Sequence, residues 1–534
     1  MIKNKSVLFI CKEVFSYPIY FLGNELEKDN NVNYYFIQNT DVIIKNELNA
    51  STYFYFKDKK SSNKIYDVKD LNYEFLNNRK NIKIDFNKLK EYEKKYTYFK
   101  GLNKQLISSQ YTSTPYHDRF YYPFTTYEEN LYWLLLNYER TESILDKINP
   151  DYIFDLDVDD IQRTIINEVA NYKKIPYINI EYSRYKSFIV PTYNLGLKLD
   201  EYFIHAYDKN KKEIFDNEYK KEVSVYREKT SIMSDFFKND ITSKYSFSLK
   251  DFFKAILEDF YNVIISEIYF LKKNKKINFF NTTPLNSNPI KRLLFWLSRD
   301  IKKFYLYSDF NNFFVSPKKE DEYIYLPLHL IPESSTFVKA PMYVNELNLI
   351  EAISKLLPIN WKLYVKEHQS MIGERSLRFY KNVKKFHNVC LVKPNYYKDP
   401  KPWIERSLGV VTITGSSAFE ATMLNKPAIV FGNSCFNVLS NIKVANNLND
   451  LETFFKSINS QNLLKDNIND CASYLKTLDE VGVDLNIKQL IKLSGKKIIS
   501  ETLEEEEENT HKELMSQLMN FFKKGVKILE NNKQ

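Results

Sequence analysis

The sequence has 534 residues, of which 43% are hydrophobic and 27% are charged, and its formal net charge is +9. A chain of this length and composition is a globular protein with about two domains, rather than a disordered or fibrous one. Only ten glycines occur, and they form neither a G-x-G-x-x-G loop nor a Walker A loop. This argues against the standard dinucleotide and P-loop sites, so a phosphate must be held in another way, such as by a helix N-terminus.

The four cysteines are widely spaced and form no C-x-x-C pair. This pattern argues against a zinc site and a disulfide framework, and it is typical of a reducing cytoplasm. The first apolar stretch is interrupted by Lys12 and Glu13, so it predicts a strand rather than a signal peptide. No apolar run approaches the roughly 18–20 residues of a membrane-spanning helix. We therefore expect a cytoplasmic protein, either soluble or peripheral at the inner face of the cell membrane.

The first part of the chain alternates predicted strands and helices. In chain order the predicted elements are a strand over 7–11, a helix over 16–28, a strand over 32–37, an irregular, partly helical insertion over 40–125, a helix over 127–148, a strand over 152–156, a helix over 160–172 and a strand over 177–181. This order predicts a Rossmann-like, acceptor-binding domain over 1–205. A helical, basic connecting region follows over 206–318.

Nearly all of the net positive charge lies in that connecting region. Residues 270–303 contain nine Lys or Arg and one Asp. Within them, the segment IKRLLFWLSRDIKKFY places Leu293, Leu294, Leu297 and Ile301 on one face of a helix, with Lys and Arg around it. We interpret this segment as a domain-linking helix whose apolar side packs inward. The alternative is an amphipathic helix that contacts an anionic membrane.

The second part of the chain has a clearer alternation. The predicted elements are a strand over 323–328, a helix over 345–357, a strand over 362–366, a helix over 374–384, a strand over 389–392, a short helix near 403, a strand over 410–413, a helix over 416–424 and a strand over 428–431. This order predicts a parallel sheet with right-handed crossovers, and so a second Rossmann-like domain over 319–484. Residues 485–534 add an acidic run and an amphipathic tail helix, which we expect to pack against the body or a partner.

Two Rossmann-like domains that face each other predict the α/β architecture called GT-B, with helical insertions and a helical C-terminal tail. Ligands in such sheets collect at the carboxyl ends of the strands. The candidate site residues are therefore sought at those ends.

The run TITGSSAFEA follows the predicted strand 410–413. Its turn contains Ser416 and Ser417 and delivers the first amides of a helix, while the two hydroxyls add donors, which suits a phosphate. Glu420, one turn later, can reach a ribose hydroxyl. The alternative is an ordinary helix cap with Glu420 as a capping carboxylate. The following strand, KPAIVFG, favours nucleotide-sugar binding.

A second candidate group, Lys366-Glu367-His368, ends the predicted strand 362–366. An ammonium, a carboxylate and an imidazole at a carboxyl edge can bind a phosphate, donate a proton to a leaving group, or do both. A lone histidine at a strand end is more often structural. The phosphate-type turn at the same edge favours a functional role for Lys366 in binding and for His368 in catalysis.

Further candidates follow other strand ends. His329 and Glu333 follow the strand 323–328 and leave the sheet toward the same cleft, where we expect His329 to help bind the nucleotide-sugar. Glu333 can serve as a nucleophile or as an electrostatic stabiliser of an oxocarbenium-like centre. The alternative for Glu333 is a helix-start carboxylate. In the first domain, Glu181 ends a strand and Arg163 lies on the helix before it. These two can bind or deprotonate an acceptor hydroxyl, although a glutamate at a strand end is often merely solvated.

The run DLDVDD over 155–160 invites a metal-binding interpretation. A calcium loop is excluded, since its sixth position would be Asp160 instead of Gly and its twelfth Ile166 instead of Glu. The D-x-D motif of metal-dependent glycosyltransferases does not suit the doubly wound second domain. We therefore predict no metal and no cofactor.

The stretch 323–436 resembles the bacterial capsule-polysaccharide synthesis family, which includes retaining β-Kdo transferases. The matching pieces are PLHLIPESS, LYVKEHQSMIGER and TITGSSAFEATMLNKPAIVFG, with a weaker match over NPDYIFDLDVDDIQRTIINEVANYKKIPYINIEYS. The resemblance implies a GT-B fold and a CMP-activated ulosonic acid such as Kdo as donor. It also implies that CMP lies against Ser416, Ser417 and His368, near an acidic nucleophile at Glu333. The family usually has Pro where this chain has Gln369, and its acid is often Asp.

We therefore expect a glycosyltransferase of capsule or lipopolysaccharide biosynthesis that transfers Kdo or a related ulosonic acid from a CMP-sugar to a glycan or glycolipid, without a metal. One alternative is a UDP-sugar or polyol-phosphate transferase on the same fold. Another is an inactive scaffold of a polysaccharide assembly complex. Nucleic acid is not an expected partner, because no recognition motif accompanies the positive charge.

Overall fold

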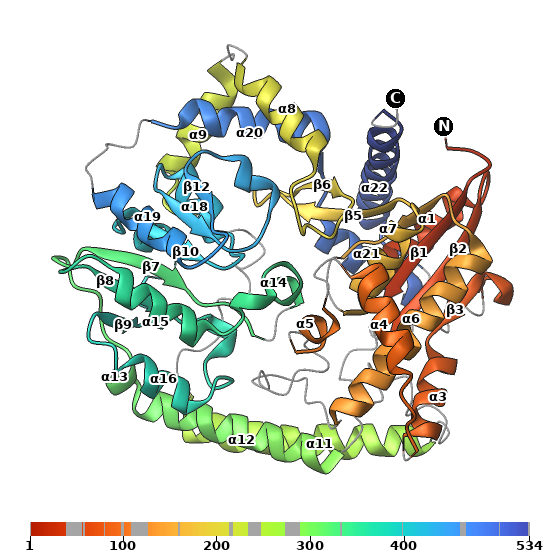
Figure 1. Cartoon of the computed structure of the whole chain (residues 1–534), viewed down its shortest axis with the longest axis horizontal. Helices are drawn as coiled ribbons and strands as arrows, with labels where there is room; N and C mark the ends of the chain where they lie inside the picture. Colours follow the sequence, from red (N-terminus) through yellow and green to blue (C-terminus); the bar gives the residue numbers. More distant parts are fainter. Residues whose placement is uncertain are drawn as a thin grey trace.

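The structure, a computed structural model, describes residues 2–38, 56, 59–79, 81–97, 101–107, 126–157, 161–212, 217–232, 247–272, 289–331, 334–397, 399–459, 466–500 and 502–531. Two α/β domains lie side by side, joined along one edge by a pair of long helices (Figure 1). The predicted class is confirmed: two Rossmann-like domains in a GT-B arrangement, with helical insertions and a helical C-terminal tail.

The N-terminal domain is built on a seven-stranded sheet of order β13-β6-β5-β4-β1-β2-β3. Its strands are β1 (Ser6–Lys12), β2 (Asn31–Gln38), β3 (Ile65–Asp67), β4 (Tyr152–Phe154), β5 (Tyr177–Tyr182), β6 (Phe188–Thr192) and β13 (Val483–Asp484). The first five strands pair in parallel, whereas β6 is antiparallel to β5 and β13 is antiparallel to β6. Four of the five match predicted strands, but β3 lies within 40–125, where the sequence predicts only an irregular, partly helical insertion.

Helices cover both faces of this sheet. They are α1 (Ser16–Leu26), α3 (Lys69–Asn78), α4 (Phe86–Tyr96), α5 (Leu102–Ile107), α6 (Tyr127–Ile148) and α7 (Ile161–Tyr172). The bounds of α6 follow from local chemistry. The Thr126 hydroxyl accepts from the Glu129 amide while the Glu129 carboxylate accepts from the Thr126 amide, and Asn149 ends the helix with φ 43° before Pro150.

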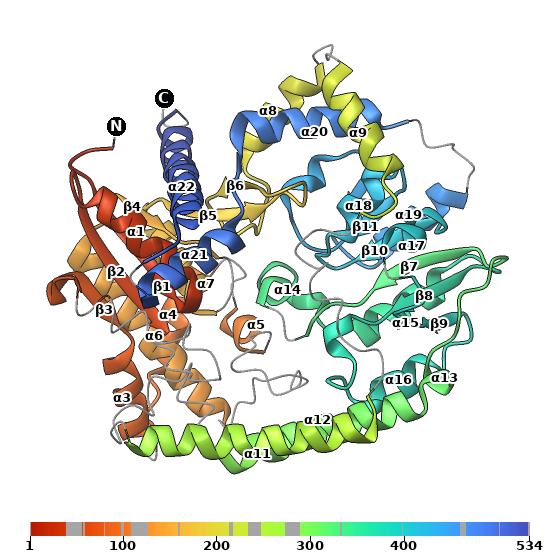
Figure 2. The same ribbon diagram turned by 180° about the vertical axis from the view of Figure 1, so that it is seen from behind.

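The last two helices, α21 (Ile487–Ser500) and α22 (Glu505–Asn531), return to the N-terminal domain. Figure 2 shows them in dark blue against the red and orange elements of that domain. The apolar stripe of α22 joins the core beneath α1, where the Phe522 ring lies 5.1 Å from that of Phe154 and the His511 ring 4.9 Å from that of Phe21. The tail helix therefore packs against the body of the same chain.

Four long helices form the connecting region. They are α8 (Glu201–Lys212), α9 (Asn217–Glu228), α11 (Leu249–Lys272) and α12 (Pro289–Ser308). The first two pack on α20 (Ile468–Val481), and the other two pair lengthwise along one edge of the molecule (Figure 1). The predicted inward packing of the apolar side of α12 is wrong for Leu294 and Ile301, which are exposed, because the opposite side of the helix contacts the C-terminal domain. None of the described helices is both long and apolar enough to cross a membrane.

The C-terminal domain has six parallel strands in the order β12-β11-β10-β7-β8-β9. They are β7 (Tyr323–Pro327), β8 (Lys362–Lys366), β9 (Val389–Val392), β10 (Gly409–Thr412), β11 (Ala428–Val430) and β12 (Ile442–Val444). The helices around them include α14 (Ser334–Lys339), α15 (Glu346–Leu356), α16 (Leu377–Val383), α17 (Lys401–Glu405), α18 (Ser417–Met423) and α19 (Asn449–Asn459). The strand order reverses between β7 and β10, where ligands bind in sheets of this kind.

Candidate functional site

The candidate site lies at the carboxyl edge of the C-terminal sheet, beside this reversal of strand order. Lys366 ends β8, and Ser416 and Glu420 belong to the turn and helix that follow β10. The Ser416 hydroxyl donates to the Glu420 carboxylate at 3.0 Å and caps no backbone amide of α18. The pKa of the Lys366 amine lies below its usual value, because burial lowers it more than the nearby Glu420 carboxylate raises it. The structure thus brings together three of the predicted site residues.

A residue of the N-terminal domain completes this group. Arg184 follows β5 in a left-handed conformation with φ 68°, and its guanidinium is close enough to Glu420 to lower the pKa of that carboxyl. Asp399, which precedes α17, raises the pKa of the Glu420 carboxyl. It also accepts hydrogen bonds from Ser231 and from the Lys401 amide. Sequence reasoning did not single out Arg184 or Asp399, because nothing in their local sequence indicates a contact between the domains.

Two cations of the site act on Glu420 without forming a direct ion pair with it. Within the described ranges, neither Lys366 nor Arg184 forms an ion pair with a carboxylate, although the Arg184 guanidinium lies 5.8 Å from the centre of the Tyr182 ring. Ser417 adds a hydroxyl that is buried and has no hydrogen-bond partner among the described residues. Two cations without a direct ion pair, together with a hydroxyl that has no described partner, are groups that suit a phosphate.

Burial raises the pKa of the Glu420 carboxyl from 4.5 to about 7. A carboxyl whose pKa is raised by folding stabilises the protein fully below the unfolded value, and this contribution is lost as the pH rises through the folded value. We therefore expect Glu420→Gln to gain stability relative to the wild type between about pH 5 and pH 8, by on the order of 2 kcal/mol at the upper end. Melting curves across this range measure the gain.

The control for this prediction is Glu405→Gln, which changes a half-exposed carboxylate in the neighbouring helix α17. Its melting temperature should follow that of the wild type at every pH. A wild type and a Glu420→Gln variant with parallel pH profiles would show that Glu420 is ionised in the folded protein throughout this range.

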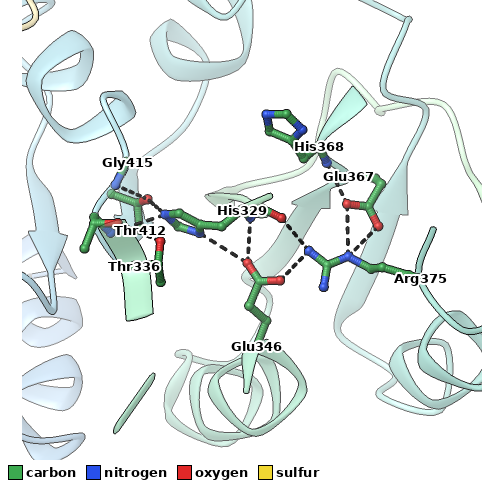
Figure 3. A network of polar contacts seen from close by, with 9 residues as sticks. His329, Thr336, Glu346, Glu367, His368, Arg375, Thr412 and Gly415 are labelled. Carbon is green, nitrogen blue, oxygen red and sulfur yellow. Dashed lines mark hydrogen bonds and ion pairs between the residues drawn. The ribbon is translucent and has the colours of Figure 1, made fainter. Parts of the chain in front are cut away.

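A buried polar network lies next to the site and holds the ends of β7 and β8 in place (Figure 3). The imidazole of His329 lies 3.2 Å from the Glu346 carboxylate at Nδ1, and its Nε2 accepts from the Thr414 amide at 3.2 Å. Since Nε2 is an acceptor, the neutral ring carries its hydrogen on Nδ1. His329 therefore fixes the turn that contains Ser416. This placement favours a positioning role, and the predicted contact of His329 with nucleotide stays a prediction.

The same network continues to β8 through Arg375. Its guanidinium contacts Glu346 at 2.5 Å and Glu367 at 2.9 Å, and it donates to the His329 carbonyl at 2.7 Å. Burial raises the pKa of Glu346, but Arg375 and His329 outweigh it and hold this pKa below the usual value. Glu367 also accepts from the Tyr380 hydroxyl at 2.8 Å. The network joins the ends of β7 and β8 to α15 and α16.

His368 lies half-buried at the rim of this network, as Figure 3 shows. Its Nδ1 accepts from the Ser370 amide at 3.2 Å, so the neutral ring carries its hydrogen on Nε2. A ring held in this tautomer has a donor for a ligand on the carboxyl side of β8.

Glu181 lies between the two domains. Its carboxylate accepts from the Lys339 ammonium at 2.6 Å and from the Ser434 hydroxyl at 2.9 Å. Gly196 approaches this group so closely, with φ 67°, that a Cβ there would lie 2.6 Å from the Glu181 carboxylate. Glu181 therefore links β5 to the C-terminal domain, and its predicted catalytic role stays a prediction.

Arg163 is fully buried in the N-terminal domain, next to the residues that follow β4. It binds Asp155 at 2.6 Å and Asp157 at 3.0 Å, and Asp155 also accepts from the Tyr177 hydroxyl at 2.7 Å. This placement favours a structural role for Arg163 over the predicted acceptor contact. The guanidinium is the cation that these two aspartates hold.

Two predictions concern residues for which the structure gives little information. Glu333, the predicted nucleophile, and residues 158–160 of the DLDVDD run lie outside the described residues. Among those that are described, no group of three or more His, Cys, Asp or Glu side chains is arranged to hold a metal ion.

No protein-family model matches the sequence, and neither does any curated protein. Among solved structures, the chain is similar to Thermosulfurimonas dismutans KpsC, a β-Kdo 2,7 transferase, at 10% identity and a TM-score of 0.29 over 63% of this chain and 79% of that one. It is similar to S. aureus MnaA in a structure with UDP, at 11% identity and a TM-score of 0.27 over 94% and 98%.

A third similar structure is the Methanocaldococcus jannaschii UDP-GlcNAc 2-epimerase in complex with UDP-GlcNAc and UDP, at 14% identity and a TM-score of 0.26 over 90% of this chain and 100% of that one. Scores this low carry no argument about activity. The two-domain α/β fold is established by the strand orders of the two sheets themselves.

Proposed function

We propose that this chain is a glycosyltransferase of surface polysaccharide biosynthesis, which transfers Kdo or a related ulosonic acid from a CMP-activated donor to a glycan or glycolipid acceptor. The observation that carries the proposal is the meeting of Lys366, Ser416 and Glu420 at the reversal of strand order, opposite Arg184 of the other domain. The resemblance of three separate motifs to the capsule-polysaccharide synthesis family also supports it.

The proposed chemistry assigns the phosphate to the unpaired cations. A CMP-sugar has one phosphate, and negative charge develops on it as the bond to the sugar breaks. Lys366 and Arg184 stabilise that charge electrostatically, and Ser417 adds a hydrogen bond. Because two cations of the chain face the same group, no dinucleotide-type glycine loop is needed.

The remaining roles are assigned by chemistry at the same edge. His368 donates its Nε2 hydrogen to the departing phosphate, and Glu420 binds a ribose hydroxyl. Glu333 acts as the nucleophile or electrostatic stabiliser at the anomeric carbon. Glu181 binds or deprotonates the acceptor hydroxyl when its contact with Lys339 is exchanged for substrate.

Thermal shifts with CMP, CDP, UMP, UDP and GDP, each with and without magnesium, test the donor. We expect selective stabilisation by CMP, independent of the metal, because a ligand at 100 times its dissociation constant adds about 2.7 kcal/mol to the stability of the folded protein. The shift should be lost in Ser417→Ala and in His368→Ala.

Preference for UDP or CDP would replace the donor with a UDP-sugar or a polyol phosphate on the same fold. A protein that responds to none of the five nucleotides would instead be an inactive scaffold of an assembly complex. Retention of the CMP shift in Ser417→Ala would remove that hydroxyl from the proposed phosphate site.

A further inference from the structure

Two aspartates are buried where helix α11 packs lengthwise on helix α12. Asp259 of α11 is 6% exposed, and Asp300 of α12 is 3% exposed. The two helices run together along the outer edge of the molecule (Figures 1 and 2). A buried carboxylate requires a cation or hydrogen-bond donors, because its charge is removed from water. The partners of these two carboxyls therefore decide how the two helices are held together.

One arginine serves both carboxyls. The Arg299 Nε donates to Asp300 Oδ1 at 3.0 Å, whereas its Nη2 lies 3.5 Å from Asp259 Oδ1. A third carboxylate, that of Glu374 in the C-terminal domain, lies 3.9 Å from the same guanidinium. The Oδ2 atoms of Asp259 and Asp300 are buried and have no hydrogen-bond donor among the described residues. Arg299 alone therefore cannot neutralise this group if all three carboxyls are ionised.

The two aspartates are also within hydrogen-bonding contact of each other. Two carboxylates in such contact repel, whereas one proton between them makes one group a donor and the other an acceptor. The pKa of the Asp259 carboxyl is raised from 3.8 to about 7, mainly by burial, with Asp300 and Glu258 adding to the rise and Arg299 opposing it. The proton resides on Asp259, because Arg299 makes its shorter contact with Asp300.

Helix α12 also contacts the loop that follows His368. The Lys302 ammonium donates to the Glu374 carbonyl at 3.0 Å. Gly373, with φ 87°, approaches the helix so closely that a Cβ there would lie 2.8 Å from the Lys303 Cα. The position of this loop therefore depends on α12, and α12 is held in turn by its contact with α11.

We propose that Asp259 and Asp300 share one proton, and that this proton fastens α11 to α12 and so holds the loop that follows His368. With the proton in place, Asp259 donates to Asp300, which forms a neutral pair with Arg299. As the pH rises, the proton passes from Asp259 to solvent, and the buried group gains a negative charge. The contact between the two helices then opens more readily, so the helix pair is a pH-sensitive brace beside the candidate site.

Hydrogen exchange of the full-length protein, followed by mass spectrometry, tests this proposal. A carboxyl with a raised pKa stabilises the contact fully below its unfolded value, and this contribution is lost as the pH rises through about 7. Opening of α11 in the wild type should therefore increase about tenfold between pH 6 and pH 8. In Asp259→Asn, whose side-chain amide keeps a donor toward Asp300, this increase should be absent. Comparison of the two proteins at each pH cancels the intrinsic pH dependence of exchange.

The matched control is Glu258→Gln, which removes the exposed carboxylate one residue earlier in α11 and should keep most of the increase. Peptides from 369–375 should exchange faster at pH 8 in the wild type than in Asp259→Asn, in step with α11. A ratio of wild-type to Asp259→Asn exchange that is the same at both pH values would overturn the shared proton. Loop peptides that do not follow α11 would overturn the link to His368. Exchange is measured without donor or acceptor, so failure of the proposed sugar transfer would leave either result standing.

Discussion

Replacement of Lys366 by alanine should, under the proposed function, slow sugar transfer by roughly two to three orders of magnitude, the loss that follows removal of one preorganised donor from a site of developing charge. Burial lowers the pKa of this amine, and no carboxylate within the described ranges pairs with it. Its charge is therefore available to a phosphate, and its removal breaks no direct ion pair within the described ranges. Release of CMP from CMP-Kdo measures the rate.

The kinetic parameters separate this role from a structural one. We expect most of the loss in kcat, because the interaction strengthens as the phosphate departs. Lys366→Arg should recover part of the rate. The control is Lys362→Ala at the amino end of the same strand β8, which should leave the rate within about twofold of the wild type. If Lys366→Ala matched that control, the phosphate would have to be held elsewhere.

Replacement of Arg375 by methionine should destabilise the protein by about 3–5 kcal/mol near neutral pH. The substitution keeps the volume but leaves the buried carboxylates of Glu346 and Glu367 without their shared cation. In the wild type the lowered pKa of Glu346 makes its contribution to stability present above the unfolded value and lost as the pH falls through the folded one. Without Arg375 the carboxyls take up protons more readily, so the deficit should narrow as the pH falls toward about 5.

Urea unfolding at two pH values measures this deficit. Arg378→Met, an exposed position three residues later in helix α16, is the control and should change stability by less than about 0.5 kcal/mol. A deficit that is small, or that is the same at both pH values, would show that the two carboxylates are not held by this arginine.

Much of the fold follows from local sequence signals. The predicted strands 362–366 and 389–392 match β8 and β9 in full, and the helix 127–148 matches α6, because apolar runs, caps and proline positions define them. The return of α21 and α22 to the first domain, and the antiparallel pairing of β13 with β6, depend on contacts across almost the whole chain. No pattern in a local stretch of sequence encodes such contacts.

The site residues also fall into two groups, those that local sequence predicts and those that depend on long-range contacts. The meeting of Lys366 with Glu420 was predictable, because the carboxyl ends of parallel strands share one edge of a sheet. Arg184 could not be predicted, since its position depends on how the two domains dock through contacts such as Lys339 with Glu181. His329 was predicted to contact a ligand, yet both of its ring nitrogens are engaged within the protein. A sequence shows that a histidine follows a strand, but not which carboxylate a later helix presents to it.

The packing of α22 on α1 has a consequence for synthesis. Phe21 and His511, whose rings touch in the folded protein, leave the ribosome about 490 residues apart, which at about 5–20 residues per second is an interval of roughly 25 to 100 seconds. Throughout that interval the side of α1 that packs on α21 and α22 is made but lacks these two helices to cover it. The N-terminal domain is therefore completed only after the C-terminal domain has been made, and until then its core leaves apolar surface exposed of the kind that promotes aggregation.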